Sequence, residues 1–170
     1  MILENGKPSV QLDGVNDNLT FGNVYNAATS ATAFTVFKAS LASSVDKNTL
    51  WDIGSVDDTH LKYFNGITYD GFSSTVRKSW TDTYSYNLHT LISVISKNNL
   101  YEFYANTLLR HSTTTNTFNT KSTNIIGKGP NPSFFQGKIQ ELILYPSDQS
   151  SNRTGIETNI ANHYGITLSL

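Results

Sequence analysis

The stretch SFFQGKIQELILYPSDQSSNRTGIETNIANHYGI, residues 133–166, indicates how the rest of the chain is organised. After Gly137 it alternates apolar and polar side chains, which is the two-residue period of a β-strand. Pro146 should end this strand, because proline has no amide hydrogen to give to a sheet. The alternation predicts one face that carries Ile139, Glu141 and Ile143, and a second face that carries Gln140, Leu142 and Leu144.

A short helix should follow this strand. Ser147 or Asp148 is expected to cap its N-terminus, since either side chain can accept a hydrogen bond from a free backbone amide. Gly165 stands where a helix commonly ends. Ile156, Ile160 and Tyr164 form an apolar stripe along one side of this helix. Such a stripe has to be buried, so we expect the helix to pack on a sheet.

The rest of the chain reads as short β-strand candidates separated by turn residues. Asn65-Gly66, between two of them, is the strongest hairpin signal, because a tight type I′ turn needs positive φ at both central residues. Many short strands at a spacing of roughly 8 to 12 residues predict an all-β, two-sheet antiparallel sandwich with a short C-terminal helix. The candidates are residues 10–12, 19–21, 33–41, 50–54, 61–64, 67–69, 74–80, 89–96, 100–105, 108–109, 122–127 and the final strand.

Both ends of the chain resemble the laminin-G-like, concanavalin A-like jelly-roll domains of bacterial surface proteins and bacteriophage virion proteins. The opening NGKPSVQLDG, residues 5–14, is similar to their first strand. Where relatives usually carry Asn-Gly after residue 105, this chain has Asn106-Thr107, so we expect a longer or distorted turn there. The resemblance implies one jelly-roll domain over residues 1–170. At the C-terminal end it rests on Phe135, Gly137, Ile139, the run Glu141 to Tyr145, and Tyr164-Gly165-Ile166.

Composition excludes several classes of function. The 170 residues are 38% hydrophobic and only 15% charged, and 12 Lys and Arg against 13 Asp and Glu leave a net charge of −1. This balance gives no basic surface for nucleic acid, and no segment is apolar enough for membrane insertion. With no cysteine, disulfides and thiolate zinc sites are absent. The N-terminus has no signal-peptide pattern, and it begins almost inside a strand, so we expect a domain excised from a larger protein.

The carboxylates do not predict an enzyme. Glycoside hydrolysis needs two carboxyl groups held about 5 to 9 Å apart. No glutamate of this chain has a second carboxylate two residues away, and no motif for a nucleophilic serine or a zinc site is present. The glutamates that we considered are Glu4, Glu102, Glu141 and Glu157, and the equally scattered histidines are His60, His89, His111 and His163.

Calcium is the one metal that the sequence leaves open. Laminin-G-like domains often hold it through an Asp carboxylate and backbone carbonyls, and it prefers six to eight oxygen ligands. Asp57 and Asp58 are the candidate ligands, with Asp13 and Asp17 as a second pair. The alternative is that these residues only form turns.

An aromatic cluster is the strongest candidate for a binding site. Trp80, Asp82, Tyr84 and Tyr86 fall within seven residues of polar sequence. Sugars stack their apolar face on aromatic rings while carboxylates bond their hydroxyls, so these four residues are candidate carbohydrate ligands. In the alternative interpretation, the rings only cap the edge of the sandwich.

We therefore expect a non-catalytic, lectin-like recognition or adhesion module that binds a glycan or a cell-surface polysaccharide. The resemblance implies an extracellular, cell-surface or virion location within a parent protein, with neighbouring virion or surface-protein subunits as further partners. The competing expectation is a structural or decoration domain that contacts only other proteins. An exposed rim of aromatic, Asp and Asn residues would favour the first, and an apolar patch would favour the second.

Overall fold

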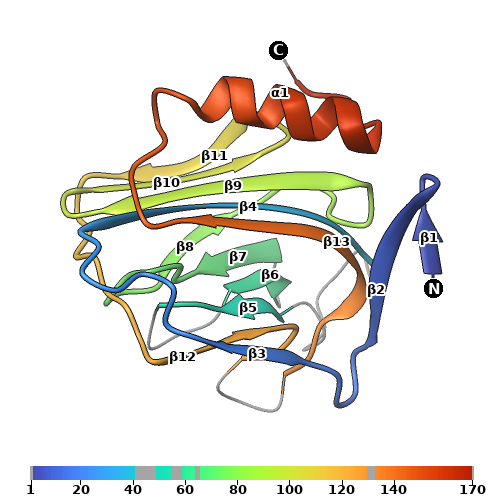
Figure 1. Cartoon of the computed structure of the whole chain (residues 1–170), viewed down its shortest axis with the longest axis horizontal. Helices are drawn as coiled ribbons and strands as arrows, with labels where there is room; N and C mark the ends of the chain where they lie inside the picture. The colour runs from blue at the N-terminus through green and yellow to red at the C-terminus, as the bar shows by residue number, and fades with distance from the viewer. Residues whose placement is uncertain (1, 41–48, 55–58, 64–65, 130–132, 170) are drawn as a thin grey trace.

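Two antiparallel β-sheets lie face to face, and one helix covers the outer side of the larger sheet (Figure 1). The computed structural model describes residues 2–40, 49–54, 59–63, 66–129 and 133–169. In spatial order, the seven-stranded sheet contains β1 (Ile2–Glu4), β2 (Lys7–Asp13), β13 (Gln136–Tyr145), β4 (Ser30–Ala39), β9 (Thr90–Lys97), β10 (Leu100–Ala105) and β11 (Leu108–Thr113). The six-stranded sheet contains β3 (Leu19–Gly22), β12 (Thr123–Ile126), β5 (Thr49–Asp52), β6 (Thr59–Tyr63), β7 (Ile67–Asp70) and β8 (Lys78–Thr81).

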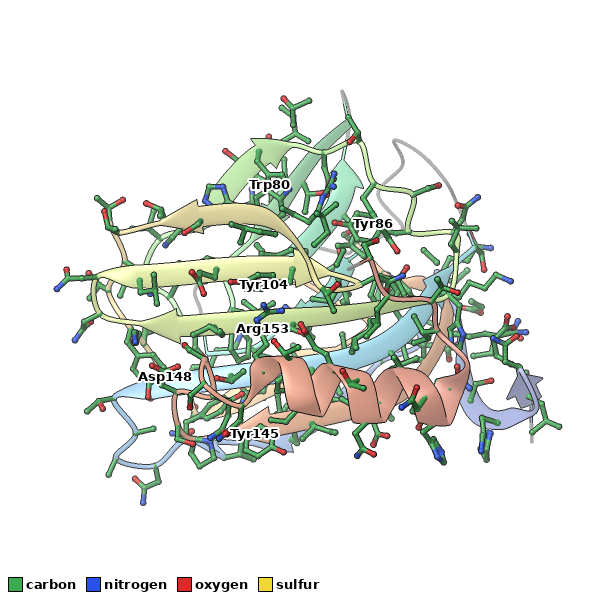
Figure 2. All side chains as sticks on the ribbon, turned by 90° about the horizontal axis from the view of Figure 1, so that it is seen from above. Trp80, Tyr86, Tyr104, Tyr145, Asp148 and Arg153 are labelled. Carbon is green, nitrogen blue, oxygen red and sulfur yellow. The ribbon has the colours of Figure 1, made fainter. Side chains whose placement is uncertain are left out.

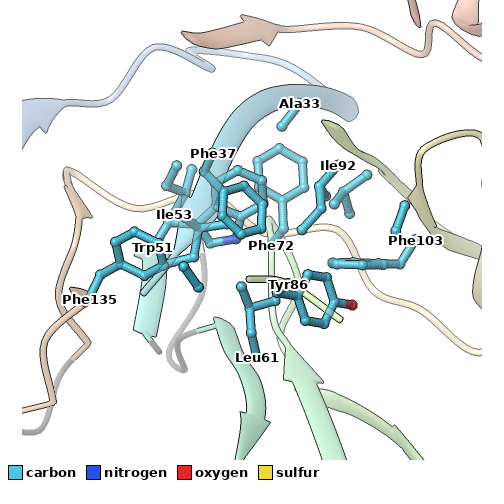
Figure 3. Close-up of a cluster of buried hydrophobic side chains, with 14 of the residues drawn as sticks. Ala33, Phe37, Trp51, Ile53, Leu61, Phe72, Tyr86, Ile92, Phe103 and Phe135 are labelled. Atoms are coloured by element: carbon cyan, nitrogen blue, oxygen red, sulfur yellow. The ribbon is translucent and has the colours of Figure 1, made fainter. Parts of the chain in front are cut away.

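The main core fills the space between the two sheets. Inward-facing aromatic side chains dominate it, among them Phe37 of the large sheet, Phe72 and Trp51 (Figure 3). The Trp51 and Phe72 ring centroids are 5.6 Å apart. Burying each large apolar side chain stabilises the fold by about 1.5 to 3 kcal/mol, so this layer is the main source of stability in a chain without disulfides.

A second, smaller core lies under helix α1 (Arg153–Tyr164). Here β4 and β9 present their outward-facing side chains to the helix, which confirms the predicted helix on a sheet. Gly165 ends the helix with φ of 67°, as expected. The buried residues of this core are Phe34, Val36, Leu91, Ile160, Ala161, Tyr164 and Ile166.

The predicted helix cap was wrong. Asn152 occupies the N-cap position, without a side-chain cap bond. Asp148 instead accepts a bond from the Ser150 amide at 2.9 Å and pairs with Lys97 of β9. The segment after Pro146 therefore first turns past the ends of β4 and β9 and becomes helical only later.

The predicted alternation of the last strand holds only in part, because Gln140 forms a β-bulge. The register shifts between Ile139 and Glu141, so Gln140 is an extra residue with no partner of its own on β4. A one-residue insertion moves the following side chains to the opposite face. Ile139 consequently packs in the main core, whereas Ile143 packs under α1, and the two do not share a face as the alternation predicted.

The hairpin at Asn106-Thr107 is tight, not longer or distorted. Ala105 pairs with Leu108, and the two turn residues have φ of 45° and 72°. The C-terminal tail supports this strained conformation, because the Ser169 amide donates to the Asn106 carbonyl at 3.0 Å. Strands β6 and β7, which flank Asn65-Gly66, pair antiparallel with Tyr63 opposite Ile67, as the predicted hairpin requires, and Asn65 itself lies outside the described residues.

Several strand boundaries also differ from the expectation, and β1 was not predicted. The candidate over residues 74–80 becomes the shorter β8, because Ser74 turns inward and bonds the Asn116 side chain at 2.7 Å. The strand β11 continues to Thr113, beyond the two leucines that predicted it. In the described part of the chain, no helix has the length and apolar character needed to span a bilayer.

Candidate functional site

The predicted aromatic segment lies where the edge strands of the two sheets approach each other, β8 on one side and β11 on the other. In the view from above the helix, Trp80 and Tyr86 lie away from α1, whereas Arg153 and Tyr104 lie beside it (Figure 2). We call this region the β8/β11 edge, defined by Trp80, Asp82, Tyr84, Tyr86, Arg110 and His111.

Asp82 is the centre of the β8/β11 edge, and it is buried. Its carboxylate accepts bonds from the Thr68 hydroxyl at 3.0 Å, the Tyr84 amide at 2.9 Å and the Tyr86 hydroxyl. The Arg110 guanidinium completes the set at 2.7 Å. Burial alone would raise the pKa of Asp82, but these hydrogen bonds and the positive charge outweigh burial and lower the pKa. Asp82 is therefore an ionised anchor between the two sheets.

Arg110 reaches Asp82 because β11 contains a second bulge. The register between β10 and β11 shifts after Phe103, and Arg110 is the extra residue. Arg110 and His111 consequently both face β8, although they are adjacent in sequence. Sequence reasoning missed this partner, because 28 residues separate Arg110 from Asp82.

Trp80 lies between two other rings. It stacks on His111 with centroids 4.9 Å apart and an interplanar angle of 11°, and its other neighbour is Phe103. Burial first, and then the charge of Lys78, lower the pKa of His111, so its neutral form is favoured. Trp80 Nε1 and His111 Nε2 make no hydrogen bond within the described part of the chain. Trp80 thus contributes to the core and still keeps part of its surface exposed.

The two tyrosines differ in accessibility. Tyr86 is buried, and burial raises its pKa well above the ordinary value. Tyr84 is half-buried, its hydroxyl lies 3.3 Å from that of Thr90, and the Arg110 guanidinium lies 5.6 Å from its ring centroid. The structure therefore brings all four predicted site residues together, but only Trp80 and Tyr84 keep ring surface that a ligand can reach.

The other acidic side chains of the interior are also engaged. Asp70 is completely buried and accepts bonds from Trp51 Nε1 at 3.2 Å and from the Tyr101 hydroxyl, and burial raises its pKa. Glu157, on the helix, is buried and pairs with Arg153 at 2.6 Å. These carboxylates hold the fold together and are not exposed to a substrate.

Of the two calcium candidates, the structure describes only the Asp13 and Asp17 pair. Asp57 and Asp58 lie outside the described residues. Asp13 accepts a bond from the Val15 amide at 2.8 Å, and Asp17 accepts one from the Asp13 amide at 3.1 Å, which is how such residues close a turn. Among the described residues, no group of three His, Asp or Glu side chains is arranged to hold a metal ion.

Comparisons with known proteins show the fold of this chain. No family model matches it, and no curated protein matches it in sequence. Among solved structures, it is similar to the CBM40 module of the Ruminococcus gnavus IT-sialidase bound to α2,3-sialyllactose, with a TM-score of 0.64 and 10% identity over 86% of this chain and 94% of that one. Domain 4 of an extracellular arabinanase from Geobacillus stearothermophilus, in complex with arabinotriose, gives a TM-score of 0.65 and 15% identity over 88% and 75% of the chains.

Mouse laminin α1 domains LG4-5 give a TM-score of 0.61 and 10% identity. The match covers 87% of this chain and 45% of the laminin chain. At such identities the likeness concerns the fold. The chain has the concanavalin A-like jelly-roll fold that its two ends predicted.

Proposed function

We propose that this chain is a non-catalytic carbohydrate-binding module, and that Trp80 and Tyr84 contact the glycan at the β8/β11 edge. The observation that carries the proposal is the agreement with CBM40, since the two structures match over 94% of a module whose structure contains a bound sialylated sugar. In this proposal Asp82 and Tyr86 do not contact the glycan. Their hydrogen bond and the ion pair between Asp82 and Arg110 hold the β8/β11 edge in place.

The carboxylates support binding in preference to hydrolysis. Retaining or inverting glycosidases need two carboxyl groups that reach the same glycosidic bond. Asp70, Asp82 and Glu157 are buried and hydrogen-bonded, and Glu4 lies between two lysines. None of these four carboxyl groups is available to a sugar as a pair. An extracellular, cell-surface or virion setting, with an adhesive role, extends the proposal.

The test is a glycan array followed by calorimetry on the purified protein, with and without calcium, using Tyr84→Ala. Tyr104→Ala is the matched control, because Tyr104 is also half-buried and also carries a guanidinium over its ring, that of Arg153 at 3.7 Å. Saturable binding that is lost in Tyr84→Ala and kept in Tyr104→Ala supports the proposal. Binding that requires calcium would extend the proposal to a calcium-dependent glycan site.

A protein-contacting role is the second candidate, and one surface favours it. At the opposite edge of the sandwich, Val10 and Leu19 are 48% and 50% exposed and line a pocket of about 180 Å³ with Leu12, Ile126 and Ile139. Exposed apolar surface of this kind is typical of contacts between proteins. If the folded protein bound no glycan on the array, this second role would replace the first.

A further inference from the structure

A pair of lysines on the outer face of the large sheet forms a charged recess that the glycan proposal does not use. Lys38 of β4 and Lys138 of β13 are direct cross-strand partners. Their neighbours Phe37 and Ile139 face the main core, so both lysines point outward from the sheet. Like charges directly opposite each other destabilise a sheet, so this pair needs a compensating anion.

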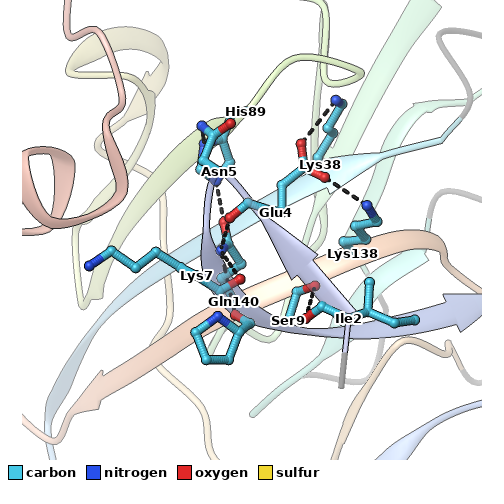
Figure 4. Close-up of polar contacts among 10 residues, drawn as sticks. Ile2, Glu4, Asn5, Lys7, Ser9, Lys38, His89, Lys138 and Gln140 are labelled. Atoms are coloured by element: carbon cyan, nitrogen blue, oxygen red, sulfur yellow. Dashed lines mark hydrogen bonds and ion pairs between the residues drawn. The ribbon is translucent and has the colours of Figure 1, made fainter.

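The chain supplies one carboxylate, that of Glu4 (Figure 4). Its two oxygens lie 3.1 Å from Lys38 Nζ and 2.8 Å from Lys138 Nζ. The hydrogen bond from Lys138, followed by that from Lys38, lowers the pKa of Glu4 against the effect of burial. The lysine pair thus already binds a carboxylate in a bridging geometry.

Glu4 is held by its backbone as well as by its charge. The Gln140 side chain, placed outward by the bulge in β13, donates to the Glu4 carbonyl at 2.9 Å. The adjacent Asn5 bonds His89 at 2.8 Å. The β1–β2 hairpin therefore lies fixed against the sheet, and it forms one wall of a recess of about 170 Å³ lined by Glu4, Lys38, Ala39, Ser40 and Lys138.

The recess keeps unused binding capacity. An ammonium group has three donors, and in the structure each lysine gives one to Glu4. The side chains of Lys38 and Lys138 are 44% and 30% exposed, and the exposed Ser40 adds a hydroxyl. Two ammonium groups and one carboxylate leave one positive charge, in a chain whose net charge is −1.

We propose that this recess binds the carboxylate of an acidic monosaccharide unit, with Lys38 and Lys138 as the charged contacts and Ser40 as a hydroxyl contact. Its volume is below the roughly 300 to 1,000 Å³ of pockets for larger ligands, which favours one terminal sugar over an extended chain. The recess is separate from the β8/β11 edge, so its test does not depend on whether Trp80 and Tyr84 contact a glycan.

The experiment is an NMR titration of the ¹⁵N-labelled protein with glucuronic acid, followed at the Ala39 and Ser40 amides. We expect saturable shifts, a millimolar affinity and loss of the shifts at high salt, because exposed charges are screened. Lys38→Met and Lys138→Met should each weaken binding about fivefold, the effect of roughly one exposed ion pair. Glu4→Gln should strengthen it about fivefold, because the competing carboxylate is removed.

Three controls decide the outcome. Lys97→Met removes a lysine of similar exposure on the same sheet, 36%, that also pairs with one carboxylate, and it should leave binding unchanged. Glucose should give no shift, and Tyr84→Ala should bind glucuronic acid normally. The proposal is overturned if glucuronic acid produces no saturable shift, if glucose does as well, if Lys97→Met weakens binding equally, or if inorganic sulfate binds where glucuronic acid does not.

Discussion

The ion pair between Asp82 and Arg110 joins the two sheets at the β8/β11 edge, and its removal should destabilise the protein strongly. The side chains are 0% and 14% exposed. Removing one partner of a buried pair costs about 3 to 5 kcal/mol, because a buried charge is left behind. In Arg110→Met, Asp82 keeps its bonds from Thr68 and Tyr84, so we expect the lower end of this range, about 3 kcal/mol.

Urea unfolding monitored by tryptophan fluorescence measures this loss as a lower midpoint. A matched control is Lys97→Met, which breaks the exposed pair with Asp148 and should cost at most about 1 kcal/mol. The double variant Asp82→Asn/Arg110→Met should lose less stability than the sum of the two single variants, because removing both charges leaves none buried alone.

The pH dependence gives an independent check. Since the pKa of Asp82 is lowered in the folded protein, its ionised form stabilises the fold above the unfolded carboxyl pKa of about 3.9, and this contribution is lost as the pH falls through the lowered value. The difference between the wild type and Arg110→Met should therefore be full at pH 7 and shrink below about pH 4. A cost under about 0.5 kcal/mol at pH 7, or a cost that does not change with pH, would refute the role assigned to this ion pair.

Three backbone substitutions should change the free energy of unfolding in different directions. Gly137→Ala should lower the free energy of unfolding by about 2 kcal/mol or more, because the new Cβ would lie 2.4 Å from the Lys38 carbonyl and 2.8 Å from the Phe135 ring. Thermal unfolding measures this loss, and an unchanged midpoint would contradict it. Thr107→Gly should stabilise by about 1 kcal/mol, since φ of 72° strains a β-branched residue, and a lower midpoint would show that its hydroxyl contributes more than the strain. Gly155→Ala, at an open position in α1, should add about 0.5 kcal/mol by the same measurement, and any loss would contradict the absence of neighbours there.

The elements whose signals are local were predictable from the sequence. The alternation after Gly137, the stripe that ends at Tyr164 and the glycine at position 165 each depend on a few neighbouring residues, and the strand and helix form there. The positions of β-bulges are not local, since the extra residue is defined by the partner strand. The bulge at Gln140 moves the side chains that follow it to the opposite face of β13, and the bulge at Arg110 turns that side chain toward β8. The alternation of apolar and polar residues indicated neither change.

The four candidate residues lie together, but the sequence did not indicate how each of them is buried. The sequence pattern does not indicate whether Asp82 faces solvent or the interior. Its burial depends on the Arg110 guanidinium, which comes from the other sheet. Trp80 likewise packs on a histidine of β11. The sequence could thus place the four residues together, but it could not divide them into a supporting pair and an exposed pair.

The position of β13 has a consequence for how the chain folds during synthesis. This strand, the last one in the described part of the chain, lies between β2 and β4 and pairs Ile139 with Val10 and Ile143 with Phe34. Until it leaves the ribosome, β2 and β4 have no partner between them, and both present unpaired backbone edges. Closure of the large sheet is therefore a late event with contacts far apart in sequence, which makes it slow and exposes the nascent chain to aggregation. Chains that stop before Gln136 should accumulate as insoluble fragments.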